Sequence, residues 1–191
     1  MEKLQCAIPV PEFLKTCVDL PRFDACCRAC PNYQSNWSCP PLPVPPMELW
    51  AQYDTLLLQC RRVDVPETLR EQTYAPEELG QIAVSLLREQ KREMLLELLE
   101  MEQQEAGSLV LAAGSCDLCP AGTCTRPQSL PCRHPEQMRY SLETLGGDMG
   151  KVLELYFDRK MIWAENGHLP AYYILLGGLL KDRRAMKGDN L

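Results

Sequence analysis

Cysteine offers more chemistry than any other residue in this chain, and most of its copies fall into two groups. The sequence holds 11 cysteines in 191 residues, far more than a typical globular protein. Thiolates are soft ligands that bind zinc and iron–sulfur clusters, so clustered cysteines indicate metal chemistry. The first group is Cys26, Cys27, Cys30 and Cys39, and the second is Cys116, Cys119, Cys124 and Cys132.

The second group has the spacing C-x2-C-x4-C-x7-C. A C-x2-C pair places two thiols on one tight turn, and Gly122 with the neighbouring prolines allows the loop to fold back. We therefore expect its four thiols to face a common centre, either one tetrahedral ion or a cubane cluster.

The first group is less complete. Cys27 and Cys30 form a C-x2-C pair, and Cys39 follows after eight further residues. Cys26 is adjacent to Cys27, and adjacent residues rarely face one small centre. The sequence therefore leaves two possibilities for the fourth ligand of this group. Either Cys17, Cys60 or a residue of the second group completes the set, or one coordination position stays unfilled and available for chemistry.

The residues that follow each group favour an iron–sulfur cofactor over zinc. Both groups end in a cysteine with proline close behind, as "SCPP" and "PCRHP", a feature of bacterial ferredoxin loops. Zinc ribbons instead use two C-x2-C knuckles, and each group here has one. We predict one or two 4Fe–4S clusters, with zinc as the alternative metal and reduced structural thiols as a third interpretation.

Composition limits the compartment and the partners. The net charge of −6 argues against a face that binds nucleic acid. No apolar run of signal-peptide length follows Lys3, and the longest apolar run, "LPAYYILLGGLL", has 12 residues, too few to cross a bilayer. We expect a cytoplasmic protein with neither nucleic acid nor membrane as partner, where thiols stay reduced. An odd number of cysteines also cannot pair completely within one chain.

The other polar residues near the cysteines have ordinary explanations as well as functional ones. His134 lies two residues after Cys132 and is either a ligand or a surface histidine, while His168 fits the Asn166–Gly167 turn. No nucleophile elbow, phosphate-binding glycine loop, dinucleotide fingerprint or HExxH motif occurs, so any catalysis would reside in the metal. Four arginines either offset the charge of thiolate-bound metal or form a solvated face: Arg28, Arg126, Arg133 and Arg139.

Hydrophobic periodicity predicts an α+β fold in a single domain over residues 1–191, with a mixed sheet, helices packed on it and two cysteine-rich metal loops. A ferredoxin-like split arrangement is the favoured topology. Gly177 and Gly178 weaken the last expected strand. We expect helices over 47–53, 76–106, 135–146 and 148–157, and strands over 54–65, 108–115 and in two parts of 159–181 around the Asn166–Gly167 turn.

The stretches "RACPNYQSNWSCPP" and "GSCDLCPAGTCTRPQSLPCRHPEQMRYSLETLG" resemble a family of domains of unknown function described as predicted metal-binding proteins, cysteine-rich proteins common in anaerobic microbes. The resemblance spans nearly the whole chain, including "LPAYYILLGGLL". It implies metal ligands at Cys27, Cys30 and Cys39 and at the four cysteines of the second group. Two departures are Gln34, where the family usually has glycine, and x4 rather than x2 before Cys124.

The favoured function is electron transfer or cluster-based redox chemistry by a 4Fe–4S protein that meets a redox partner protein. Cys27, Cys30 and Cys39 are the candidate ligands of the more reactive cofactor. The alternative is a zinc-stabilised structural or interaction module without a redox role, and a third option is a redox enzyme that works at an open metal position.

Overall fold

The centre of the protein is a four-stranded sheet with the order β1-β2-β4-β3, seen in a computed structural model that describes residues 2–182. All three pairs of strands are antiparallel. β2 and β3 therefore run in the same direction, with β4 between them. The strands are β1 (Glu2–Pro9), β2 (Thr55–Asp64), β3 (Leu109–Leu111) and β4 (Tyr172–Lys181).

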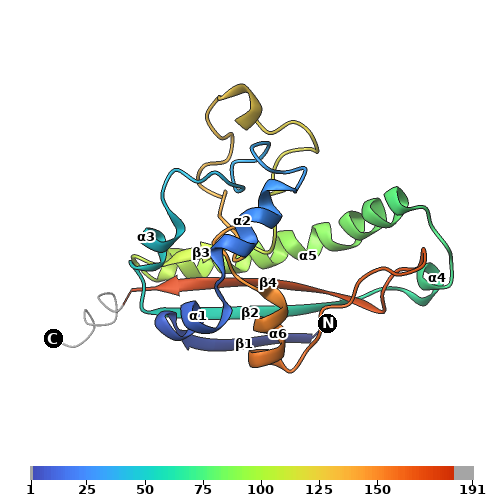
Figure 1. Ribbon diagram of the computed structural model, residues 1–191, viewed down its shortest axis with the longest axis horizontal. Helices are drawn as coiled ribbons and strands as arrows, with labels where there is room; N and C mark the ends of the chain where they lie inside the picture. The colour runs from blue at the N-terminus through green and yellow to red at the C-terminus, as the bar shows by residue number, and fades with distance from the viewer. Residues whose placement is uncertain (1, 183–191) are drawn as a thin grey trace.

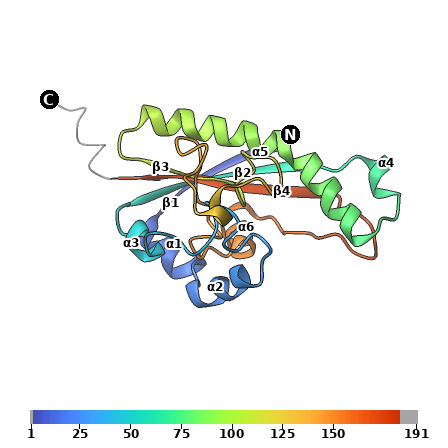
Figure 2. The same cartoon turned by 90° about the horizontal axis from the view of Figure 1, so that it is seen from above.

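Helices cover both faces of this sheet. The long helix α5 lies along one face, and α1, α3 and α6 lie on the other (Figures 1 and 2). Within residues 2–182, no helix combines the length and apolar character needed to cross a membrane. The helices are α1 (Val10–Cys17), α2 (Leu20–Arg28), α3 (Pro46–Trp50), α4 (Glu67–Arg70), α5 (Pro76–Gln104) and α6 (Met149–Phe157), with a short 3₁₀ turn at Arg126–Gln128.

The side chains of the central strands alternate between two cores, as expected for a sheet that is covered on both faces. Leu56, Leu58 and Cys60 of β2 point into the core formed with α1, α3 and α6. Leu175 and Leu179 of β4 belong to the other core, which is closed by α5. The burial of both faces explains why three successive leucines, residues 56–58, occur in β2.

The α+β class is confirmed, and so are the expected helices that became α3, α5 and α6. The two glycines in β4 do not interrupt the strand. A β-carbon added to Gly177 would lie 2.9 Å from the carbonyl oxygen of Leu111, and one added to Gly178 would lie 2.8 Å from that of Leu57. Both glycines thus allow a close approach of neighbouring backbone that a larger residue would block.

The expected mixed sheet is wrong, because every strand pair is antiparallel. The sequence pattern of strand, long helix and strand suggested parallel neighbours, but β4 inserts between β2 and β3 and makes a split β-α-β unit. The full ferredoxin-like order β-α-β-β-α-β is not present, since helices separate all four strands along the chain.

Two further expected elements are wrong. Residues 135–146 form turns instead of a helix, because the backbone there closes a loop: Ala112 N–H donates to the carbonyl of Tyr140 at 2.8 Å. Residues 159–165 form no strand, although the turn at Asn166–Gly167 is present and is flanked by an isolated bridge between Glu165 and His168.

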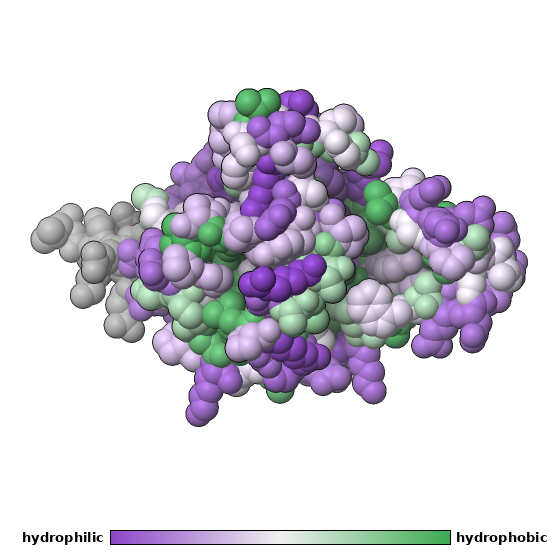
Figure 3. Space-filling model, turned by 45° about the horizontal axis from the view of Figure 1, so that its top comes forward, coloured by the Kyte–Doolittle hydropathy of each residue, from purple (hydrophilic) through white to green (hydrophobic). Residues whose placement is uncertain are grey.

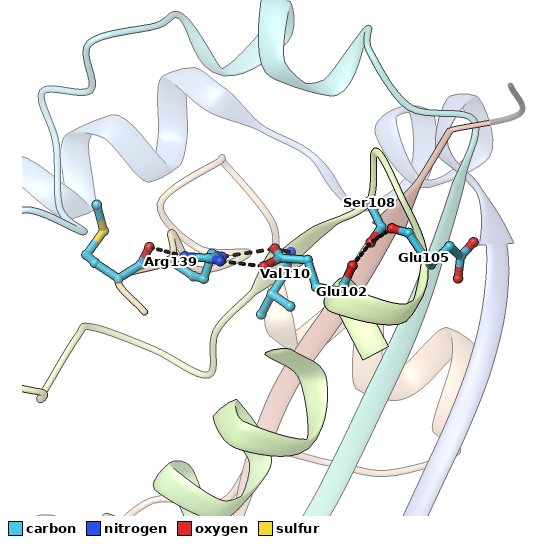
Figure 4. Close-up of polar contacts among 6 residues, drawn as sticks. Glu102, Glu105, Ser108, Val110 and Arg139 are labelled. Atoms are coloured by element: carbon cyan, nitrogen blue, oxygen red, sulfur yellow. Dashed lines mark hydrogen bonds and ion pairs between the residues drawn. The ribbon is translucent and has the colours of Figure 1, made fainter. Parts of the chain in front are cut away.

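A buried ion pair fixes the base of the second cysteine loop (Figure 4). Glu102, near the end of α5, accepts from Arg139 Nε at 2.9 Å and from a second guanidinium nitrogen of the same residue. The Glu102 carboxylate also accepts from the backbone N–H of Val110 at 2.7 Å. Both side chains of the ion pair are largely buried, with 16% and 14% exposed. One carboxylate therefore holds α5, β3 and the returning chain together.

We predict that Glu102→Gln lowers the free energy of unfolding by about 2–3 kcal/mol, because Arg139 would keep its charge in a buried position without a counter-charge. Urea denaturation measures the effect. Glu100→Gln is the matched control on the same helix, since Glu100 is exposed, and it should change stability by no more than about 0.5 kcal/mol. Equal effects of the two substitutions would contradict the role given to Glu102.

Candidate metal centre

The two cysteine groups are far apart in sequence, but their loops are in contact. We call residues 26–41 the first cysteine loop and residues 113–135 the second. In Figure 1 the first loop, in blue, and the second loop, in yellow to ochre, rise together from the body of the molecule.

The first contacts between the loops involve the backbone of Cys116. The side-chain amide of Asn36 donates to the carbonyl of Cys116 at 2.7 Å. The Cys116 N–H in turn donates to the hydroxyl of Ser38 at 2.9 Å, and Ser38 is fully buried. Both backbone groups of Cys116 are thus satisfied by the first loop, which fixes the start of the second loop against it.

Arg126 provides the second set of contacts. Its guanidinium donates to the carbonyls of Asn36 at 2.5 Å, Pro41 at 2.7 Å and also Cys39. It lies over the ring of Trp37, with 5.6 Å between the guanidinium carbon and the ring centroid. A guanidinium has five N–H donors in a fixed plane, so one arginine can donate hydrogen bonds to several carbonyls of an irregular loop.

The first cysteines sit at the end of a helix. Cys27 is in the last turn of α2, and the Cys30 N–H donates to the Cys27 carbonyl at 3.0 Å, so the C-x2-C pair does form a tight turn. Cys39 is buried, whereas Cys26 and Cys30 are exposed. Gln34 has a φ of 59°, so it adopts the left-handed conformation that favours the glycine expected at this place.

The four cysteines of the second group line one cavity of about 830 Å³ between the two loops. All four are half-buried. His134 also borders the cavity, and its backbone N–H donates to the sulfur of Cys132 at 3.4 Å. The first loop contributes Asn32 and Asn36 to the same walls.

The thiols do not converge on a preformed point. Over residues 2–182, no three cysteine, histidine, aspartate or glutamate side chains gather closely enough to hold a metal ion. The convergence that we expected from the spacing of the second group is therefore not met in this conformation. A metal bound by these cysteines would have to draw the thiols together.

Burial sets the protonation of several of these thiols. It raises the pKa of the Cys116 thiol to about 11 and raises the pKa of Cys27 and Cys39 above the usual value. Nearby cysteine thiolates add to the rise at all three positions, while Arg126 lowers the pKa of Cys39. These three thiols are therefore protonated at neutral pH and would release protons when they bind a metal.

The remaining candidates lie elsewhere or already have partners. Cys17 and Cys60 are buried in the core, as expected for small apolar residues. His168 is exposed beside its turn. Among the four arginines, Arg28 pairs with Asp24 and Arg139 with Glu102, Arg126 joins the two loops, and Arg133 donates to the carbonyl of Thr123 in its own loop.

Sequence reasoning did not predict that Asn36, Ser38 and Arg126 join the loops. The first two lie inside the "NWSCPP" motif, so the motif carried a signal that we assigned only to its cysteine. In Figure 3, the region of the loops is a mixture of hydrophilic and intermediate residues, with hydrophobic residues in small groups. On that face the loops form a mainly polar protrusion.

Comparisons with curated proteins and with solved structures found no match. One family model matches residues 15–176, a span that includes both cysteine loops, strands β2 and β3 and helix α5. This match confirms the resemblance drawn from the two cysteine motifs. The chain therefore belongs to the family described as predicted metal-binding protein (DUF2284).

Proposed function

We propose that the protein binds iron–sulfur clusters of the 4Fe–4S type through the cysteines of its two loops. In this proposal it acts in the cytoplasm, in electron transfer or cluster-based redox chemistry with a redox partner protein. The proposed ligands are Cys27, Cys30 and Cys39 of the first loop and Cys116, Cys119, Cys124 and Cys132 of the second loop.

The observation that carries the proposal is the direct joining of two cysteine loops that lie about 80 residues apart in sequence, through Asn36 and Cys116. A fold that needed these cysteines only as small apolar residues would place them in the core, as it does with Cys17 and Cys60. The seven loop cysteines instead lie outside both hydrophobic cores. The four thiols of the second loop border the cavity, Cys30 is exposed, Cys27 is half-buried and Cys39 is buried.

The chemistry of the donors fits the cofactor. The proposed ligands are all thiols, the ligands that 4Fe–4S clusters use, and the second loop supplies four of them around one cavity. When bound, such a cluster supplies one-electron transfer. The protein would contribute thiolate charge, the guanidinium of Arg126 beside Cys39, and backbone N–H groups such as that of His134, which already donates to sulfur.

The first test is the identity of the metal. Full-length protein reconstituted with iron and sulfide without oxygen should become brown, with a broad visible absorbance that bleaches on addition of dithionite and a paramagnetic signal in the reduced state. A colourless protein that holds stoichiometric zinc and unfolds on chelation would instead support the structural zinc module.

The second test concerns Arg126. We predict that Arg126→Gln weakens binding of zinc(II), used as a probe of the thiols, by about tenfold or more, because residues that orient ligands typically contribute 10–100-fold to metal affinity. Competition with a chromophoric chelator measures this change.

Arg133→Gln is the matched control for Arg126→Gln. Arg133 lies in the same loop and donates to the carbonyl of Thr123, but it makes no hydrogen bond to the first loop among the described contacts. Its substitution should leave the affinity for zinc(II) within about twofold of the wild type. A similar loss in both variants would show that the charge of the loop, rather than the joining of the two loops, sets the affinity.

A further inference from the structure

Helix α5 also borders the cavity between the cysteine loops. Val84 and Arg88 of this helix line the cavity together with the four thiols of the second loop. These two residues are four positions apart, so they lie on the same face of the helix. The side chain of Val84 is 57% exposed, and Arg88 is exposed as well. One hydrophobic and one cationic side chain of α5 thus share the cavity with the candidate metal ligands.

The next turn of α5 is attached to the start of the second loop. Lys91 follows Arg88 by three residues and therefore lies beside it on the helix surface. The Lys91 ammonium donates to the carbonyl of Ser115 at 2.9 Å and pairs with the carboxylate of Asp117 at 3.0 Å. Only 19% of the Lys91 side chain is exposed. These contacts hold the helix against the loop, and they set the position of Arg88 at the cavity.

The charges around the cavity leave Arg88 unpaired. Apart from His134 and the cysteines, the ionisable side chains that border the cavity are Arg88 and Asp117. Asp117 is already paired with Lys91. Within residues 2–182, Arg88 makes no hydrogen bond and no ion pair. In a protein whose net charge is −6, this cavity therefore carries one positive side chain without a partner.

The chemistry of the walls indicates the class of ligand. The planar N–H groups of a guanidinium match the two oxygens of a carboxylate. A single unpaired positive charge also balances one carboxylate, whereas a phosphate monoester would bring a second negative charge. Val84, Leu118 and Met138 offer apolar surface to an organic group. The volume of about 830 Å³ lies in the range of cavities that hold small molecules.

We propose that this cavity binds a small organic carboxylate, whose charged end is held by Arg88 and whose apolar part packs against the hydrophobic side chains of the walls. The bound carboxylate lies in the same cavity as the four thiols of the second loop, and so beside any centre that they hold. Its role as a substrate of a redox centre rests on the proposed function, whereas its binding at Arg88 does not.

The test compares iodoacetate with iodoacetamide, two thiol reagents of similar size that differ in charge. Full-length protein is reduced and freed of metal by chelation, and mass spectrometry follows the rate of alkylation of each cysteine. Arg88→Gln should slow the reaction of the second-loop thiols with iodoacetate by about threefold or more, because the reagent loses a charge-assisted contact. Their reaction with iodoacetamide should stay within about 1.5-fold of the wild type, because Arg88 does not attract a neutral reagent.

Arg92→Gln is the matched control. Arg92 is exposed one turn further along α5 and does not border the cavity, so its substitution should change neither rate. Cys30 serves as an internal control in every variant, because it is exposed and lies outside the cavity lining. Its rates with both reagents should be the same in all three proteins.

A measurement on the wild type keeps the test independent of how the variants fold. Butyrate, added in excess as the probe carboxylate, should slow the alkylation of the second-loop thiols by both reagents and leave Cys30 unaffected. Butyramide, which has the same apolar part without the charge, should protect much less. Equal protection by butyrate and butyramide, or protection by neither, would contradict a carboxylate site.

Three results with the variants would overturn the proposal: equal slowing by Arg88→Gln and Arg92→Gln, equal slowing with both reagents, or no slowing by Arg88→Gln. Equal slowing with both reagents would show that Arg88 acts on the ionisation of the thiols and not on an anion. The proposed function fails on a different observation, since a wild-type protein that takes up no iron and sulfide refutes the redox role whatever the alkylation rates are.

Discussion

The backbone of the first cysteine loop has carbonyls that no helix or strand satisfies, and the guanidinium of Arg126 collects three of them. Carbonyl groups left without partners inside a protein carry a large desolvation cost, so an irregular loop needs such a donor. Because Arg126 belongs to the second loop, it satisfies the first loop only when the two loops lie together. The joining of the loops therefore adds hydrogen bonds to a loop whose own backbone already supplies others, such as that from the Cys39 N–H to the Asn36 carbonyl at 3.0 Å.

The rest of the fold serves to bring Arg126 to that place. Helix α5 has 29 residues, about 44 Å at 1.5 Å per residue, and it carries the chain back to the edge of the sheet at β3. The ion pair of Glu102 and Arg139 and the hydrogen bond from Ala112 to Tyr140 then hold both ends of the second loop. The second loop is irregular inside but anchored at its base.

The parts of this arrangement that depend on local pattern could be predicted from the sequence. The period of α5 and the apolar run of β2 follow directly from burial on one side or on both. Strand β1 was not predicted, although Leu4, Cys6 and Ile8 alternate along it, because the alternation is short and the strand lies at the edge of the sheet. The position of β4 between β2 and β3 has no local signal at all, since it depends on a pairing more than 100 residues distant in sequence.

For the second group of cysteines, the sequence predicted four thiols that face a common centre, and the structure meets this only in part. The spacing of the second group indicates four thiols in one place, and they do line one cavity. The spacing of cysteines cannot predict how the thiols are oriented when no cation is bound. The contacts from Arg126 to the first loop were missed for a related reason. An arginine in a polar loop is usually solvated, and its partners here are backbone carbonyls, which every residue has and which therefore leave no signal in the sequence.

The protonation of the thiols explains why these cysteines lie near one another but do not face a single point. Burial and neighbouring cysteines raise the pKa of Cys27, Cys39 and Cys116, so each thiolate makes the next one harder to form. Several thiolates can face one point only when a cation there offsets their charge, and protons must leave as it binds. Arg126 already lowers the pKa of Cys39. The same guanidinium that joins the loops therefore also favours the ionised form of a buried thiol, so that one side chain both holds the backbone of Cys39 and offsets part of the rise in its pKa.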